Sequence, residues 1–220
     1  MKLRNVFFLI LLIIVADQAL KIWIKTSMNY HEERFIIGRW FRFYFIENEG
    51  MAYGWKIGGE WGKTLLTLFR LGAVIFGTWY LARIVKQKYH KGFIICAGLI
   101  YAGALGNLID SLFYGMLFDK GMRFDVATMS QFTYDGLAKF AGKGYSSFLH
   151  GNVVDMLYFP IFENVMMPKW IPFWGGKPFT FFQPIFNIAD ASISIGVITI
   201  LLFQKRFFKQ RNEEEVNPTV

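Results

Sequence analysis

The chain has 220 residues, of which 54% are hydrophobic and only 18% are charged. A soluble domain carries about a quarter charged residues, so this composition excludes an ordinary soluble protein and indicates a membrane protein. A single Cys excludes a disulfide framework and any multi-cysteine metal or iron–sulfur site, whereas the net charge of +8 must be located along the chain before it can be interpreted.

Four stretches approach the roughly 20 apolar residues that a membrane-spanning helix needs. They run over about 5–24, 64–82, 92–110 and 185–203. We therefore expect an α-helical integral membrane protein in which residues 1–220 form a single domain with four transmembrane helices. The long connections cover 25–63 and 111–184, and the tail over 210–220 is expected to be disordered.

The first stretch has a second interpretation, a cleavable signal peptide. Lys2 and Arg4 precede an apolar run that ends at Ala16, as in a secretory signal. We favour a retained span because apolar residues continue over 22–24. N-terminal sequencing of the purified protein decides, since a chain that starts near Asp17 would contradict the four-span arrangement.

The basic residues gather in three short segments, before the first stretch, between the second and third, and after the fourth. They are Lys2, Arg4, Arg83, Lys86, Lys88, Lys91, Lys205, Arg206, Lys209 and Arg211. Cytoplasmic segments of membrane proteins carry such an excess. We therefore expect both termini and the loop over 83–91 in the cytoplasm and the two long connections outside. The positive net charge is then explained by the orientation of the protein in the membrane. No motif in the sequence supports nucleic-acid binding.

The two outward connections carry aromatic signals. Aromatic and β-branched residues over 40–46, followed by the turn signal Asn48-Glu49-Gly50, predict a strand and a hairpin in a small outer sheet. Gly54, Gly58 and Gly59 then punctuate a short second element. An aromatic interfacial loop is the alternative. In the later part of the second connection, the residues expected at the outer membrane interface are Trp170, Pro172, Phe173, Trp174, Phe179, Phe181 and Phe182.

Acids and amides stand at the expected outer ends of the spans, where ionisable groups are costly and indicate a functional site. Asp17 and Lys21 are four residues apart and can pair on one helix face. Asn107 and Asp110 share a face at the end of the third stretch. Structural alternatives stay open, namely an anchoring ion pair for Asp17 and a water-facing helix end for Asp110.

Two further aspartates stand in apolar surroundings. Asp155 lies between two β-branched residues and Met156, and a surface acid on an interfacial loop is its alternative interpretation. Asp190 lies about one turn inside the fourth stretch, shares a face with Asn187, and has no Lys or Arg nearby in sequence. It is the strongest single indication of function in the chain.

Two carboxylates that meet at a membrane surface would support peptide hydrolysis. Like charges a few ångströms apart cannot both ionise, so the pair holds one proton. The ionised member activates water and the protonated member assists the carbonyl and the leaving amine, without a metal or cofactor. Other sets are weaker: the zinc-like run that starts at His31 has Phe35 in place of the second His, and Cys96 in mid-span is typical of packing.

Five short motifs together resemble the signal peptidase II family, the lipoprotein signal peptidases. They occur in the family's order as Asp17-Gln18-x-x-Lys21, Asn48-x-Gly50-x-Ala52, Gly106-Asn107-x-x-Asp110, Val153-Val154-Asp155 and Phe186-Asn187-x-Ala189-Asp190. The resemblance covers the chain except roughly 113–148, 163–180 and the tail. It implies an aspartyl endopeptidase of the bacterial plasma membrane that removes signal peptides from diacylglyceryl-modified prolipoproteins, before the lipidated cysteine at the outer face.

The resemblance also assigns roles, motif by motif. It implies that Asp155 and Asp190 are the catalytic pair. The substrate-binding or site-supporting residues that it implies are Asp17, Lys21, Asn48, Gly50, Asn107, Asp110 and Asn187. The expected partners are the prolipoprotein and membrane lipids, the protein is expected to be a monomer, and the antibiotic globomycin is expected to inhibit it.

The chain departs from the family pattern in three places. Ser111 stands where the family commonly has Arg, Tyr53 stands where Phe or Trp is common, and about 45 residues separate Asp110 from Asp155. Arg123 is one hypothetical replacement for the missing Arg. The extra residues, 113–150, are called the insertion below, and they could form a lid over the cleft or a partner-binding element.

Two rival functions would leave different features in the sequence. A small carrier would use Asp17, Asp110 and Asp190 as proton or cation sites, but it would place polar residues at the bilayer midplane, where this chain is apolar. A presenilin-like protease would carry a Gly-x-Gly-Asp signature, which is absent from the sequence.

Overall fold

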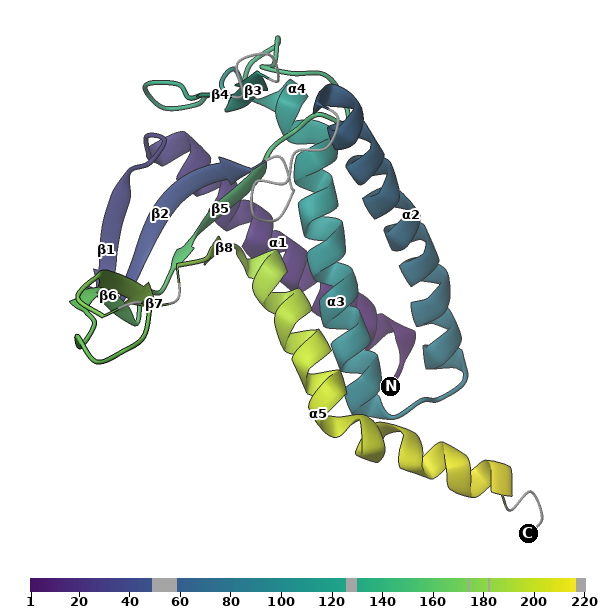
Figure 1. Cartoon of the computed structure of the whole chain (residues 1–220). Coiled ribbons are helices and arrows are strands. Elements are labelled where there is room, and N and C mark those ends of the chain that lie inside the picture. Colours follow the sequence, from purple (N-terminus) through teal and green to yellow (C-terminus); the bar gives the residue numbers. More distant parts are fainter. Residues whose placement is uncertain (49–58, 126–129, 174, 182, 217–220) are drawn as a thin grey trace.

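The computed structural model describes residues 1–48, 59–125, 130–173, 175–181 and 183–216 (Figure 1). Within these residues, four helices are long and apolar enough to cross a membrane: Leu3–Ser27, Trp61–Lys86, Lys91–Leu117 and Ile188–Phe208. They belong to α1 (Leu3–Ser27), α2 (Gly59–Lys86), α3 (Lys91–Ile109) with its extension, and α5 (Ile188–Val216). The expectation of a helical membrane protein with four spans is confirmed.

The helix ends differ from the apolar stretches by a few residues. The third span continues past α3 as a π-helical turn, Asp110–Tyr114, and the short α4, Gly115–Leu117. The fourth begins at Ile188 instead of 185, because Ile185–Phe186 form a strand. α5 contains a non-helical residue at Phe203, and its last turns include part of the tail whose disorder stays a prediction.

α3 lies at the centre of the bundle and contacts α1, α2 and α5. Glycine allows its close approach to α5, because a Cβ on Gly103 would lie 2.2 Å from the carbonyl oxygen of Ala189. The N-terminus, the short α2–α3 connection and the last turns of α5 lie at one end of the bundle (Figure 1). The acids and amides of the five motifs lie toward the other end.

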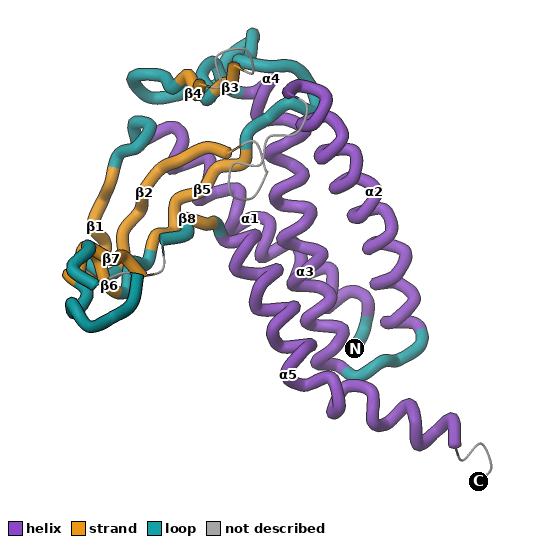
Figure 2. The backbone as a smooth tube through the Cα atoms, viewed as in Figure 1, coloured by secondary structure: helices purple, strands orange, loops and turns teal. Residues whose placement is uncertain are grey.

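A four-stranded antiparallel sheet stands beside that other end, in the order β1-β2-β5-β8 (Figure 2). Its strands are β1 (Glu33–Ile37), β2 (Phe41–Asn48), β5 (Val153–Tyr158) and β8 (Ile185–Phe186). The strand expected over 40–46 is confirmed as part of β2. Its hairpin partner is the preceding strand β1, and residues 49–58, where the second element was expected, lie outside the described residues.

Among the described residues, two further sheets, each of two strands, are separate from the four-stranded sheet. β3 (Arg123–Asp125) pairs with β4 (Ser130–Phe132) inside the insertion, and β6 (Phe162–Met166) pairs with β7 (Pro178–Phe181) in the connection that leads to α5. The insertion packs on the rest of the molecule, because Phe118 and Tyr145 share a buried core cluster with Phe45 of β2. β5, which carries Asp155, has no counterpart among the predicted elements.

Candidate active site

Asp155 and Asp190 come from different elements and meet through Asn187. Asp155 lies on β5 and is 2% exposed, and Asp190 lies in the first turn of α5. Asn187 donates from Nδ2 to Oδ1 of Asp155 at 2.6 Å, and its Oδ1 accepts a hydrogen bond from the backbone N–H of Asp190 at 2.9 Å. Asn187 therefore caps α5 and fixes both aspartates relative to each other.

Two more amides reach the carboxylates. Asn48, the last residue of β2, donates from Nδ2 to Oδ2 of Asp155, and Asn107 of α3 donates to Oδ1 of Asp190 at 2.8 Å. Burial, followed by the nearby charge of Asp190, raises the pKa of Asp155 well above its usual range. The pair therefore retains a proton at pH values where an isolated carboxyl has lost it.

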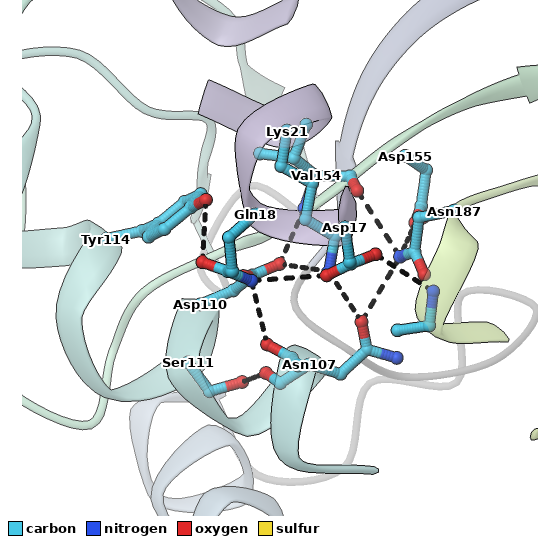
Figure 3. Close-up of polar contacts among 12 residues, drawn as sticks. Asp17, Gln18, Lys21, Asn107, Asp110, Ser111, Tyr114, Val154, Asp155 and Asn187 are labelled. Atoms are coloured by element: carbon cyan, nitrogen blue, oxygen red, sulfur yellow. Dashed lines mark hydrogen bonds and ion pairs between the residues drawn. The ribbon is translucent and has the colours of Figure 1, made fainter. Parts of the chain in front are cut away.

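A buried ammonium organises the supporting residues (Figure 3). Nζ of Lys21 lies 2.9 Å from Oδ2 of Asp17 and 2.8 Å from Oδ2 of Asp110, and it donates to Oδ1 of Asn107 at 2.9 Å. Its three protons are thus all used. The pairing of Asp17 with Lys21 is confirmed. Because the same ammonium also holds Asp110 and Asn107, the network orients the amide that reaches Asp190.

The network also supports the start of α5. Oδ1 of Asp17 accepts a hydrogen bond from the backbone N–H of Ala189 at 2.9 Å, so a carboxylate of α1 caps α5. Gln18 was not expected at the site, yet it donates to Oδ1 of Asp110 at 2.8 Å and accepts from the hydroxyl of Tyr114 at 3.1 Å. Gln18 is part of the motif Asp17-Gln18-x-x-Lys21, and this position could have indicated that it belongs to the site.

Arg70 is a second residue that the sequence analysis did not include. It comes from α2 and donates from Nη1 to Oγ of Ser111 at 2.9 Å, and Ser111 in turn donates to the carbonyl of Asn107 at 3.0 Å. Its guanidinium lies within electrostatic range of Asp155 and Asp190. Arg70 is a basic residue inside the otherwise apolar stretch 64–82, and such a residue indicates a functional site.

The remaining expected residues have separate positions. Arg123 lies on β3 and donates to the backbone carbonyl of Tyr145, within the insertion. Gly50 and Tyr53 lie outside the described residues. All the other expected site residues belong to the one connected set of contacts described above.

Comparison with known proteins shows the family of the chain. The family model described as Signal peptidase (SPase) II matches residues 9–206. The lipoprotein signal peptidase of Porphyromonas gingivalis is 43% identical over 199 residues, which cover 90% of this chain and 81% of that protein. The lipoprotein signal peptidase of Amoebophilus asiaticus is 31% identical over 212 residues, which cover 95% of this chain and 81% of the relative.

Solved structures support the fold. Two structures titled as a bacterial membrane enzyme solved by the in meso method match with TM-scores of 0.56 at 22% and 23% identity. The matches cover 92% and 91% of this chain and 89% and 92% of theirs. The relatives favour the peptidase interpretation over the carrier. The chain therefore belongs to the signal peptidase II family, and it is a multi-pass membrane peptidase of the aspartic type that removes signal peptides from prolipoproteins.

Proposed function

We propose that Asp155 and Asp190 are the catalytic pair and that they hydrolyse the bond before the lipidated cysteine of diacylglyceryl-modified prolipoproteins. The observation that carries this proposal is the position of Asn187, which bonds to Asp155 through its amide and to the backbone of Asp190 through its oxygen. A structural ion pair would place a cation between two such acids, whereas this arrangement places an amide there.

The proposed reaction needs one proton on the pair. The ionised carboxylate takes a proton from water as the water oxygen attacks the scissile carbonyl carbon, and the protonated carboxyl donates its proton to the carbonyl oxygen. The resulting diol collapses: the C–N bond breaks, the departing nitrogen receives a proton from the pair, and one hydroxyl group of the diol returns its proton to the pair as the new carbonyl forms. The products are a new carboxylic acid and the free amine of the cysteine, and the pair again holds one proton.

The surrounding polar residues act as positioning groups in this proposal. Asn48 and Asn187 donate to the two oxygens of Asp155, and Asn107 donates to Asp190. Donors fixed in advance avoid reorganisation during the reaction. Lys21 balances the charge of the remaining acids and holds the oxygen of Asn107.

The membrane supplies the rest of the substrate's orientation. The basic segments near both termini and between α2 and α3 support a cytoplasmic location for the end of the bundle that holds the α2–α3 connection (Figure 1). Because the proposed catalytic pair lies toward the opposite end, we expect it at the outer face. A diacylglyceryl group keeps the scissile bond at the membrane surface, and the apolar signal helix reaches the site by lateral diffusion. Binding of lipid and helix then holds one peptide bond against the pair.

A gel-shift assay with a diacylated prolipoprotein tests the proposal. We expect cleavage by the wild type, inhibition by globomycin, and no cleavage by Asp155→Asn or Asp190→Asn, although both variants are found in the membrane fraction. Asp135→Asn is the matched control, because Asp135 is an exposed residue of the insertion. Substantial cleavage by either variant of the pair would contradict the proposal.

A further inference from the structure

A buried ion pair separate from the contacts of Lys21 lies close to the proposed catalytic pair. Lys25, in the last turn of α1, contacts Glu47 of β2, and both side chains are fully buried. Glu47 also accepts hydrogen bonds from the hydroxyl of Tyr134 at 2.6 Å, the backbone N–H of Met122 at 3.0 Å and Nδ2 of Asn152 at 2.9 Å. A buried carboxylate is tolerated only when it is paired in this way.

The insertion supplies much of this environment. Tyr134 and Met122 belong to the insertion, and three of its rings surround the ammonium of Lys25. The ring centroids of Phe118 and Tyr145 lie 5.1 Å from Nζ, and that of Tyr134 lies 5.5 Å away. Aromatic faces stabilise a desolvated cation. The insertion is therefore packed into the molecule, which argues against a detachable lid.

The ion pair of Lys25 and Glu47 lies next in sequence to a residue that donates a hydrogen bond to Asp155. Glu47 directly precedes Asn48, whose amide donates to Asp155. In the β2–β5 register, Glu47 lies opposite Val154, the neighbour of Asp155. Whatever fixes Glu47 therefore fixes the end of β2 against the part of β5 that carries the aspartate.

Asn152 ties the insertion to the start of β5 as well. Its backbone N–H donates to the hydroxyl of Tyr145 at 2.7 Å, and its Nδ2 donates to the carbonyl of Met122 at 2.6 Å. Lys63 of α2 donates to its side-chain oxygen. Asn152 is fully buried. The strand that presents Asp155 thus begins from a residue held by the insertion on one side and by α2 on the other.

We propose that the insertion is a positioning clamp, in which Tyr134 and the backbone of Met122 hold Glu47 so that Asn48 stays bonded to Asp155. Glu47 and Tyr134 are positioning residues and do not touch the substrate. The inference rests on the proposed function of Asp155. It assigns a role to residues that the family motifs do not include.

The clamp predicts a specific kinetic effect. The amide of Asn48 stabilises the ionised form of Asp155, so loosening it raises the pKa of the catalytic pair and moves the pH–rate profile to higher pH. Within the described residues, the other charged groups that act on Asp155 include Asp190, Lys21, Asp110 and Arg70, and Tyr134→Phe replaces none of them. A merely structural role would lower stability without moving the profile of the folded enzyme.

Tyr134→Phe is the main test, because it removes one hydroxyl and keeps the ring beside Lys25. We expect kcat to fall about tenfold, a KM for diacylated prolipoprotein within about twofold of wild type, and a pH–rate profile displaced upward. Tyr44→Phe is the matched control, since Tyr44 lies on β2, the strand of Glu47, and its hydroxyl contacts only the exposed His31 ring at 2.9 Å in the described contacts. Glu47→Gln should have a larger effect where it folds.

A double-mutant cycle shows whether the effect passes through Asn48. In an Asn48→Ala background, Tyr134→Phe should have no further effect on kcat. Additive losses, or a wild-type pH profile in Tyr134→Phe, would overturn the clamp. A wild type that leaves the prolipoprotein uncut would contradict the proposed function instead, so the two failures are distinguishable.

Discussion

Asn187 donates a hydrogen bond of 2.6 Å to Asp155, although 32 residues separate the two in sequence. The same side chain caps the first turn of α5, where Asp190 lies. The position of one proposed catalytic carboxylate therefore depends on how the helix of the other begins. Asp17 adds a second cap at Ala189, so α1 contributes to the same helix start.

Replacing Asn187 by Ala should damage both the reaction and the fold. We expect kcat to fall about 10²- to 10³-fold, the effect of losing one preorganised donor. The free energy of unfolding should fall by about 1 kcal/mol for the lost cap and by about 1–3 kcal/mol more for the lost hydrogen bond to the buried Asp155. The measurements are the cleavage rate and thermal unfolding in detergent. Asn29→Ala is the control, because Asn29 is exposed and bonds only to Glu32 through its side chain in the described contacts. A normal rate in Asn187→Ala would contradict the bridging role.

Replacing Lys21 by Met should destabilise the protein strongly. The change leaves Asp17 and Asp110 buried without their shared cation, which costs about 3–5 kcal/mol when one partner of a buried pair is removed. Thermal unfolding should occur well below the wild-type temperature. Lys139→Met, at an exposed position, should stay within about 0.5 kcal/mol of wild type. Equal stability of the two variants would show that the ion pairs contribute nothing.

The raised pKa of Asp155 sets the direction of the pH dependence. The pair is active with one proton, so the rate should fall as pH rises through the raised pKa, and that alkaline limb should lie well above the ordinary range of a carboxyl. Since the folded state holds this proton more tightly than the unfolded state, stability should decrease as pH rises from the ordinary range of a carboxyl up to the raised pKa. A pH–rate profile of kcat with folded-protein controls at each pH is the measurement. A rate that stays constant far into the alkaline range would contradict the shared proton.

The sequence predicts the spans well because each is an apolar run long enough to cross a bilayer. β2 is also predictable, since aromatic residues and Ile46 occupy most of its first six positions. β5 is not, because its first four residues are buried on both faces and show no alternation of polar and apolar side chains. The two-residue strand β8 is too short to separate from the helix that follows, so the fourth span was expected to start too early.

The site is predictable to the extent that its residues lie in short motifs. Asp17 with Lys21, and Asn187 with Asp190, are near in sequence, and helix periodicity places each pair on one face. Contacts between elements are different. The bond from Arg70 to Ser111 and the bond from Tyr134 to Glu47 depend on tertiary packing, which a single sequence does not encode as a local pattern.

Arg70 and Arg123 offer a direct comparison. Arg70 bonds to Ser111, the position at which the family resemblance led us to expect Arg, and its charge lies near the proposed pair, whereas Arg123 bonds within the insertion. We expect Arg70→Gln to lower kcat/KM at least tenfold, about the effect of one charged hydrogen bond, and Arg123→Ala to change it less than threefold. Cleavage kinetics with the diacylated prolipoprotein decide. A larger loss in Arg123→Ala than in Arg70→Gln would instead support Arg123 as the residue that replaces the Arg expected at position 111.

The loop between β6 and β7 should enter the outer membrane interface. Phe173 is 92% exposed and Trp170 is 81% exposed, and such aromatic side chains favour the headgroup region. A nitroxide attached at Phe173→Cys in a Cys96→Ser background should be more accessible to oxygen than to a water-soluble nickel chelate in vesicles. A label at the exposed Lys143→Cys of the insertion should show the opposite preference. If both labels preferred the nickel chelate, the loop would be in water, and its aromatic residues would need a partner other than lipid.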